Sequence, residues 1–446
     1  MLRRSAISFL LVLVGISGWA RTRPHYGGTL RVEIAGDGVT SLDATLLHLV
    51  LDGLTRTGSD GSLQPALATE WKSSNGDRRW EFTLRDGVTF HNGFPLTADR
   101  AIASLTQDCD GACPWSTLKA QGNSLIFTSD SPMPELPWLL AENRFLIRLM
   151  DAGDGKEPPC CIGNGPYQLT DRHGPGFTLA ANDGYWAGRS YADTIEVVTG
   201  RSVRDQWLDL SVGRADVVQV PPEELRLAQQ QRMTVLSSPP VDLLALQITT
   251  NGVLANQPLR AAISLSIDRA ALFNVIFQKQ GEITASILPQ ELSGYAFLFP
   301  AERDLAKAQE LRGGVKPPTL SLGYQGDGSM QLAAQRIALN LHEAGFDVQV
   351  TGAPHPDLLL RSIPLASADP SAALESVFRA SGEIALLAAT SPTALYRAEH
   401  DFLDRKSLVP LLDLPRGYAV GTHVRDLTLR SDGTPDLAEA WLEATQ

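Results

Sequence analysis

The stretches LQPALATEW (Leu63–Trp71) and WEFTLRDGVTFHNGFPLTAD (Trp80–Asp99) carry the clearest structural pattern of this 446-residue chain. Apolar and polar residues alternate over Trp80–Leu84, which predicts a strand with one buried face. Asp86-Gly87 is a turn signal, and Val88–Phe90 is the expected continuation, so this region resembles a hairpin.

A helix is predicted directly after this region, over residues 98–106. Thr97 is a suitable N-terminal cap, and Asp99 in the first turn interacts favourably with the helix dipole. Closer to the N-terminus, the alternating segment Gly28–Ile34 predicts an early strand.

The second half of the chain mixes helices and strands. Ala255–Gln278 has apolar residues along one face, with Asn256 as a cap candidate, and predicts a single well-packed helix. Thr319–Tyr324, a following helix that stops at Gly345, and Phe346–Val350 form a strand–helix–strand unit. Such units build parallel sheets, so the fold class is α/β.

Residues 1–20 read as a secretory signal peptide. Arg3 and Arg4 precede the apolar run Ala6–Ile16, and small residues follow at a cleavage site, so the mature chain is expected to begin near Arg21. The segment is short for a membrane span, and no cysteine follows the cleavage site to accept a lipid. These features predict an exported periplasmic protein that is not a lipoprotein.

The charge balance is acidic. The formal net charge is −12, and it becomes −14 when the signal, with its two arginines and no acid, is removed. Such a chain lacks the clustered positive charge that attracts phosphate backbones, so nucleic acid is not expected as a partner.

All four cysteines, Cys109, Cys113, Cys160 and Cys161, lie in the mature part. Export to an oxidising compartment favours disulfides, and four cysteines allow three connectivities. A zinc site is the alternative, but no histidine lies nearby and the CxxC spacing is missing. No metal is therefore expected.

Enzyme motifs are incomplete. Gly326-Asp327-Gly328 lacks the third glycine of a dinucleotide-binding turn, and His342-Glu343 lacks the second histidine of a zinc-protease helix. No G-x-S-x-G elbow or phosphate-binding G-x-x-x-x-G-K loop occurs. We expect neither catalysis nor a cofactor.

Further motifs complete the pattern. They are GNGPY (Gly163–Tyr167), NDGYW (Asn182–Trp186), LDLSVGRADVVQV (Leu208–Val220) and the segment Arg260–Leu272 with its Ile-Asp-Arg. Together with Leu63–Asp99, they resemble the family 5 extracellular solute-binding proteins, the dipeptide, oligopeptide and nickel receptors of ABC importers. These motifs serve as scaffold, with Asp268 and Arg269 expected to form an ion pair on a helix surface.

The resemblance implies a two-lobed periplasmic binding protein, a Venus-flytrap, with an extra subdomain inserted in the first lobe. The expected parts are the signal peptide (1–20), lobe I (21–50 and 163–240), the inserted subdomain (51–162), lobe II (241–415) and a C-terminal return to lobe I (416–446). The region 132–165, rich in Pro and Gly, agrees with a boundary there.

The function that the resemblance implies is capture of a small ligand, of peptide or peptide-like kind, and its delivery to the permease subunits of an ABC importer. The chain is expected to act as a monomer. The alternatives are a sensor or accessory relative that has lost transport, and a receptor for a metal chelate with His355, Asp357 and His400 as potential ligands.

Two departures from the family bear on the ligand. Ala366 stands where peptide receptors carry an aspartate for the peptide's amino group, and Ile248 replaces an asparagine in a segment expected near the hinge. Without that carboxylate a buried ammonium is costly, unless Asp369 or Asp357 takes its place. The residues expected at the ligand are Asp43, Ile248, Thr249, Tyr324, Ala366 and Asp369.

Overall fold

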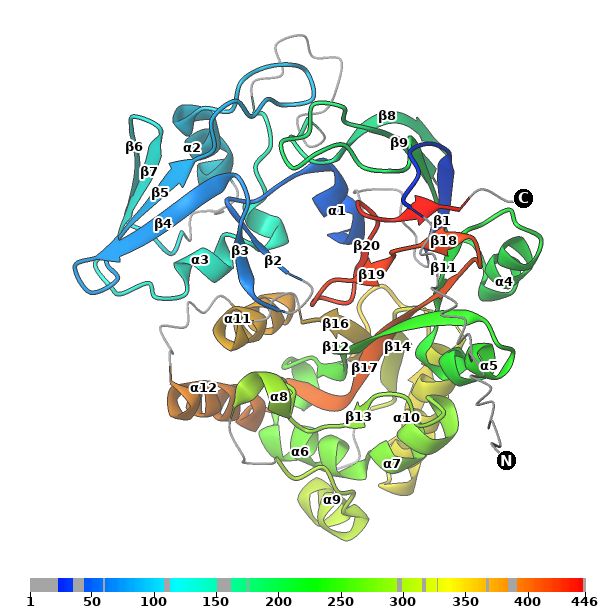
Figure 1. Ribbon diagram of the computed structural model, residues 1–446. Helices are drawn as coiled ribbons and strands as arrows, with labels where there is room; N and C mark the ends of the chain where they lie inside the picture. Colours follow the sequence, from blue (N-terminus) through cyan, green and yellow to red (C-terminus); the bar gives the residue numbers. More distant parts are fainter. Residues whose placement is uncertain are drawn as a thin grey trace, which may run out of the picture.

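The computed structural model describes residues 23–34, 44–58, 61–107, 113–150, 162–174, 176–294, 299–314, 318–326, 328–365, 369–383 and 391–443. These residues form two α/β lobes that share one large sheet, and a separate four-stranded unit that lies beside the first lobe (Figure 1). The predicted signal peptide lies outside the described residues. Among the described helices, none has both the length and the apolar character that a membrane crossing requires.

The large sheet has eleven strands, ten of them in the order β15-β14-β16-β12-β17-β11-β1-β10-β9-β8, with β13 paired to β17. The strands are β1 (Thr29–Ile34), β8 (Tyr167–His173), β9 (Gly176–Ala181), β10 (Thr194–Thr199), β11 (Val217–Val220), β12 (Thr234–Ile248), β13 (Glu282–Ile283), β14 (Leu320–Tyr324), β15 (Val348–Val350), β16 (Leu358–Pro364) and β17 (Leu408–Val420).

Both lobes use the long antiparallel pair β12 and β17. The start of β12 pairs with the end of β17 beside β11, and the rest of β12 pairs with β16 and the start of β17. The register shifts around Pro240, which lies opposite Pro415. Because proline cannot donate to the ladder, the backbone hydrogen bonding is interrupted at this crossing, where both strands pass from one lobe to the other.

The first lobe contains the described parts of 23–58, 162–237 and 417–443. The early strand predicted from the sequence is β1, which runs parallel to β10 and β11. Its helices are α1 (Ala44–Val50), α4 (Val203–Ser211), η3 (Pro222–Glu224) and α5 (Leu225–Gln230), and its C-terminal part adds the short strands β18 (Val424–Arg425), β19 (Thr428–Leu429), β20 (Pro435–Asp436) and β21 (Trp441–Leu442).

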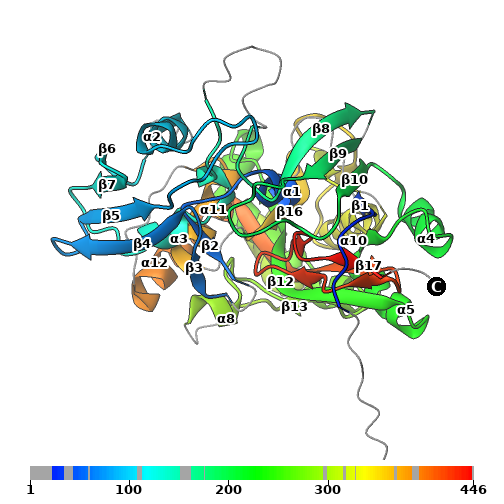
Figure 2. The same cartoon turned by 45° about the horizontal axis from the view of Figure 1, so that its top comes forward.

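The four-stranded unit covers the described part of 61–150 and has its own apolar core. Its strands are β4 (Ala68–Ser74), β5 (Arg79–Leu84), β6 (Thr117–Gln121) and β7 (Ser124–Thr128), its helices are α2 (Ala98–Gln107), α3 (Leu136–Leu139) and η1 (Asn143–Phe145), and β2 (Thr55–Thr57) with β3 (Leu63–Pro65) connects it to the first lobe. Figure 2 shows this sheet and α2 apart from the strands of the large sheet.

Helix α2 confirms the predicted helix. Its predicted cap is also present, since Thr97 Oγ1 accepts a hydrogen bond from Arg100 N at 3.3 Å. The predicted hairpin at Val88–Phe90 is wrong. Both edges of β5 are occupied by β4 and β7. The chain after the turn instead buries Val88 and Phe90, which are 4% and 1% exposed, in the core of the unit.

The second lobe contains the described part of 242–414. The predicted strand–helix–strand unit is present as β14, α10 and β15, with parallel strands. The helices of this lobe are η4 (Gly252–Ala255), α6 (Gln257–Ser266), α7 (Arg269–Ala271), η5 (Leu272–Ile276), α8 (Gln290–Ser293), α9 (Leu305–Arg312), α10 (Ser329–Glu343), α11 (Pro370–Ala380) and α12 (Pro392–Asp404).

The single helix predicted over Ala255–Gln278 is wrong, because the chain breaks into four short helices there. Asp268 causes one break: its Oδ1 accepts from Ala271 N at 2.9 Å and starts α7. The predicted ion pair of Asp268 with Arg269 on a helix surface is also wrong. Arg269 is buried and donates from Nε to the Pro410 carbonyl at 3.0 Å, while Asp268 lies 3.7 Å from Arg336.

The motif GNGPY joins the first lobe to the four-stranded unit. Asn164 Oδ1 accepts from Asp52 N at 3.0 Å, the Gly163 carbonyl accepts from His91 N at 2.8 Å, and the Gly165 carbonyl accepts from Asn182 Nδ2 at 3.0 Å. Three motifs that are far apart in the sequence therefore meet at one junction.

Candidate functional site

A cavity of about 560 Å³ lies between the two lobes. Helix α11 and strand β16 of the second lobe form one wall, η1 and the C-terminal part of the first lobe form the facing wall, and β12 and β17 contribute the floor. The lining residues are Glu142, Asn143, Arg144, Gln219, Asp242, Arg361, Ser362, Ile363, Pro364, Leu365, Ala372, Glu375, Ser376, Arg379, Ala380, Arg416, Asp432 and Thr434.

An ion pair crosses the floor of this interlobe cavity. Arg416 donates from Nε and Nη2 to the two carboxylate oxygens of Asp242, at 2.8 and 2.7 Å. The backbone N–H of Arg416 donates to Ser238 Oγ at 2.9 Å. Burial by itself lowers the pKa of Arg416, but the hydrogen bonds to Asp242 outweigh it and the pKa is raised. The pair joins β12 and β17 next to their crossing.

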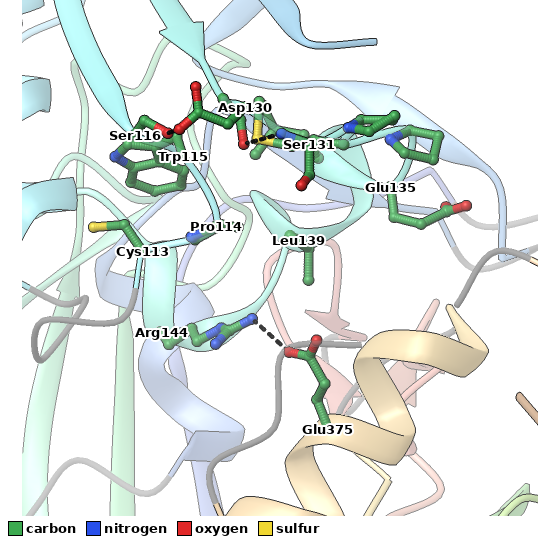
Figure 3. Close-up of a pocket in the computed structure, with 15 residues that line it drawn as sticks. Cys113, Pro114, Trp115, Ser116, Asp130, Ser131, Glu135, Leu139, Arg144 and Glu375 are labelled. Carbon is green, nitrogen blue, oxygen red and sulfur yellow. Dashed lines mark hydrogen bonds and ion pairs between the residues drawn. The ribbon is translucent and has the colours of Figure 1, made fainter. Parts of the chain in front are cut away.

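Arg144 joins the lobes across the cavity. Its Nε donates to Glu142 Oε2 at 2.8 Å, and its Nη2 lies 3.9 Å from Glu375 Oε2 on α11 (Figure 3). The guanidinium also lies over the ring of Phe145, 4.6 Å from the ring centroid. A residue of the four-stranded unit thus contacts the second lobe directly.

Burial raises the pKa of Glu142 to about 7, because Arg144 only partly offsets the loss of water and the carboxylates of Glu375 and Asp369 add repulsion. Near neutral pH this carboxyl group therefore carries a proton part of the time and can act as a hydrogen-bond donor.

A second cavity, of about 420 Å³, adjoins the first and shares Arg144 and Glu375 with it. It lies mainly in the four-stranded unit, as Figure 3 shows. It is lined by Cys113, Pro114, Trp115, Ser116, Ser129, Asp130, Ser131, Pro132, Met133, Pro134, Glu135, Leu136, Leu139, Arg144 and Glu375.

Two carboxyl groups meet across the lobes beside this second cavity. Glu135 of the four-stranded unit is hydrogen-bonded to Asp369, and burial together with the Asp369 charge raises the pKa of Glu135 to about 7. Burial also raises the pKa of Asp369, although Asp369 Oδ1 accepts from Ala372 N at 2.8 Å and caps α11. One proton shared between the two groups relieves their repulsion.

The ligand residues predicted from the sequence are not brought together. Asp369 lies at the boundary between the lobes, whereas Tyr324 ends β14 and packs against the core of the second lobe. Asp43 and Ala366 lie outside the described residues. Asp357 does not move toward the cavity, because its Oδ2 accepts from Ser321 N and Oγ at 2.8 and 2.7 Å.

Ile248 and Thr249 line a different hollow, of about 640 Å³, on the second lobe. They lie at the end of β12, beyond its pairing with the start of β17, and away from the prolines of the crossing. The expectation that this segment lies near the hinge stays a prediction. Ile248 itself is 2% exposed and belongs to the apolar core.

The remaining residues singled out from the sequence are the cysteines and the candidate metal ligand His400. Cys113 is disulfide-bonded, as predicted, and its partner is outside the described residues, as are Cys109, Cys160 and Cys161. The ring of His400 packs beside Phe299 and Tyr396. Among the described residues, no three His, Cys, Asp or Glu side chains gather in a way that could hold a metal ion.

Sequence reasoning missed most of the cavity. Arg144, Arg416 and Glu375 carry no motif, and each acquires its place only when distant segments pack together. Helix α11 carries a partial sequence signal of the cavity wall. Its residues Ala372, Glu375, Ser376 and Arg379 recur at helical spacing, and two of them place a charge on the same face.

Comparisons with known proteins agree with this geometry. Residues 62–375 match the model of the bacterial extracellular solute-binding proteins, family 5. The chain is 29% identical over 263 residues to the uncharacterized protein YhjP of Bacillus subtilis, covering 54% of this chain and 42% of that protein. It is 26% identical over 365 residues to the probable D,D-dipeptide-binding periplasmic protein DdpA of Escherichia coli, covering 76% of this chain and 66% of that protein.

The matched part thus spans less than two thirds of these two curated relatives. The crystal structure of NikA from Staphylococcus aureus, in complex with Ni(L-His)2, has the same fold. Its TM-score is 0.80 at 17% sequence identity, and the match covers 91% of this chain and 97% of that one.

Proposed function

Because this chain belongs to the bacterial extracellular solute-binding proteins of family 5, we propose that it is a receptor that captures a small ligand and delivers it to the permease subunits of an ABC importer. The proposed ligand is a peptide or a peptide-like molecule. The proposed role is binding and release, without chemical conversion of the ligand.

The observation that carries this proposal is the interlobe cavity. Its volume of about 560 Å³ falls in the range of small-molecule sites. Its walls come from both lobes, on either side of the proline-marked crossing of β12 and β17. A ligand that contacts both walls favours the closed arrangement, and this is how a two-lobed receptor reports that it is loaded.

The peptide-like ligand is supported by the similarity to the probable D,D-dipeptide-binding protein DdpA and by the mixture of charged, polar and apolar residues around the cavity. Arg144 and Asp369, at the boundary between the lobes, are proposed to sense the ligand. Asp43 and Ala366 remain predictions from the sequence.

The remaining parts of the proposal concern location and organisation. The protein is exported by a signal peptide over residues 1–20, carries no lipid and acts in the periplasm as a monomer. The segment 51–162 is an inserted subdomain of the first lobe, and its separate sheet and core support this division.

Native mass spectrometry of the mature protein, purified from a periplasm and then unfolded to release bound molecules, tests the proposal. Ser376→Trp, which fills the cavity wall on α11, should abolish any bound mass. Leu332→Trp, on the exposed face of α10, is the matched control and should retain it.

A discrete bound mass in the wild-type protein and the control, and its loss in Ser376→Trp, supports the receptor. Wild-type protein without bound mass, and without any response to peptide mixtures, overturns it and favours the accessory relative. Uptake of the released compound by cells with and without this protein then tests delivery to an importer.

A further inference from the structure

Most charged side chains around the interlobe cavity are paired with one another. Arg416 binds Asp242 with two hydrogen bonds, at 2.8 and 2.7 Å. Arg144 lies between Glu142, at 2.8 Å, and Glu375, at 3.9 Å. These groups offer a ligand little net charge, because each already faces an opposite charge.

Asp432 is also satisfied, since it accepts hydrogen bonds from the N–H and the hydroxyl of Thr434 at 3.0 and 2.6 Å. The exceptions in the cavity wall are Arg361 on β16 and Arg379 on α11. Within the described part of the chain, no ion pair joins either guanidinium to a carboxylate. Both arginines line the cavity.

Part of the Arg361 side chain is hydrogen-bonded within the protein. Its Nη1 donates to Gln247 Oε1 and to the Ala380 carbonyl, both at 3.2 Å. Its Nε is buried and makes no hydrogen bond to any described residue. Burial lowers the pKa of Arg361, which reflects a positive charge with neutral surroundings. A buried donor without an acceptor costs free energy until an acceptor arrives.

Arg379 directly precedes Ala380, and the Ala380 carbonyl accepts a hydrogen bond from Arg361. Both arginines are therefore associated with the C-terminal end of α11. A cation at a helix C-terminus is favourable in itself, and this accounts for one exposed arginine. It does not account for the buried Nε of Arg361. Glu375, one helical turn before Arg379, is directed toward Arg144 instead (Figure 3).

We propose that Arg361 and Arg379 together bind a carboxylate group of the ligand, at the end of the cavity formed by the C-terminus of α11. This inference rests on the proposed function and adds the chemical class of the ligand. The planar guanidinium matches a carboxylate with paired N–H donors, and two guanidiniums can bind both of its oxygens.

The same arrangement orients the ligand. Elsewhere in the cavity wall, Glu142 and Glu375 lie around the single guanidinium of Arg144, so a second carboxylate there would be repelled. The ligand therefore places its acidic group at Arg361 and Arg379, and a neutral or donor group toward Arg144.

Isothermal calorimetry with charge-matched probes tests this assignment. N-acetyl-dialanine carries only a carboxylate, dialanine amide only an ammonium, and N-acetyl-dialanine amide no charge. Succinate and succinamide form a second, non-peptide pair. The proteins are the wild type, Arg361→Gln, Arg379→Gln, and Arg204→Gln as a control on the exposed surface of α4.

We expect a carboxylate probe to bind the wild type and Arg204→Gln, and its amide to bind more weakly. Each cavity variant should weaken the carboxylate probe about 10- to 100-fold, the range for a hydrogen bond between charged groups. If Arg361→Gln unfolds because its contact with Ala380 is lost, the exposed Arg379→Gln still decides the result.

Binding of dialanine amide or of the neutral probe in preference to both carboxylates overturns the carboxylate site and leaves the receptor standing. Equal carboxylate affinity in the wild type and in Arg379→Gln has the same meaning. A protein that carries no native ligand and binds none of the probes overturns both proposals.

Discussion

Gly163 lies against the backbone of Val50, so close that a Cβ atom added to Gly163 would stand 1.9 Å from the Val50 carbonyl oxygen. The obstacle is main chain, which cannot rotate away as a side chain can. This contact explains the first glycine of the GNGPY motif, which joins the first lobe to the four-stranded unit.

Gly163→Ala should therefore lower the free energy of unfolding by about 3 kcal/mol, the upper range for overpacking a close contact. Gly314→Ala is the control, because a Cβ at Gly314 meets nothing within 4 Å. Chemical denaturation of both variants measures the effect. Equal stability of the two would contradict a rigid junction at Gly163.

Ligand affinity should depend on pH through Glu135 and Asp369. The pKa of Glu135 is raised from its ordinary value of 4.5 to about 7, first by burial and then by the charge of Asp369 on the other lobe. We expect this contact to form when the lobes close, so that closure takes up a proton; the contribution of this proton is then complete below about pH 4.5 and is lost as the pH rises from 4.5 to 7.

Glu135→Gln retains a hydrogen bond to Asp369 and removes one titrating group. Calorimetric affinity for the native ligand, measured from pH 5.5 to 8.5, should fall with pH in the wild type and stay flatter in the variant. Glu142, whose pKa is also raised to about 7, adds a parallel dependence that Glu142→Gln isolates. Identical slopes in all three proteins would exclude a shared proton at the lobe boundary.

Glu399 should make the folded protein less stable as the pH rises. Its side chain is fully buried and accepts from the backbone N–H groups of Ile287 and Leu288, yet burial raises its pKa from 4.5 to about 7. The stability that this group contributes is complete below about pH 4.5 and declines between pH 4.5 and 7, by up to about 3 kcal/mol.

Glu399→Gln keeps an acceptor for the two N–H groups and does not titrate. Denaturant unfolding at pH 5 and pH 8 should show a smaller difference in stability for the variant than for the wild type. An unchanged difference would mean that Glu399 remains ionised in the folded state.

The disulfide of Cys113 should contribute about 2–4 kcal/mol, because it restricts the unfolded chain. Cys113→Ser, compared with the wild type in the presence and absence of a reductant, measures this contribution. Peptide mapping without reduction identifies the partner among Cys109, Cys160 and Cys161. If the wild type and Cys113→Ser are equally stable without a reductant, this cross-link adds nothing.

The sequence predicted the scaffold well where a local steric demand leaves a residue signature. Gly163 and Thr97 are examples, since backbone approach requires a glycine and the start of a helix requires an oxygen. Prediction failed where one residue has two ordinary roles. Asp268 resembles a helix-surface acid in sequence, but in the structure it caps the next helix, and so the expected long helix is divided.

The residues of the cavity could not be predicted from the sequence for a different reason. Between Arg144 and Glu375 the sequence holds a long part of the first lobe and most of the second, and only the approach of the four-stranded unit to the second lobe places the two side chains 3.9 Å apart. Local patterns carry no information about such pairs. Asp369 was found because the resemblance led to its neighbourhood.

The shared strands β12 and β17 also determine how far the molecule can be divided. Each lobe completes its part of the sheet with one half of both strands, so a fragment ending at the crossing would expose a long row of unpaired backbone groups. Neither lobe is then an autonomous folding unit. We therefore expect truncated forms that end at the crossing to aggregate, and a sensor engineered from this protein to require both strands intact.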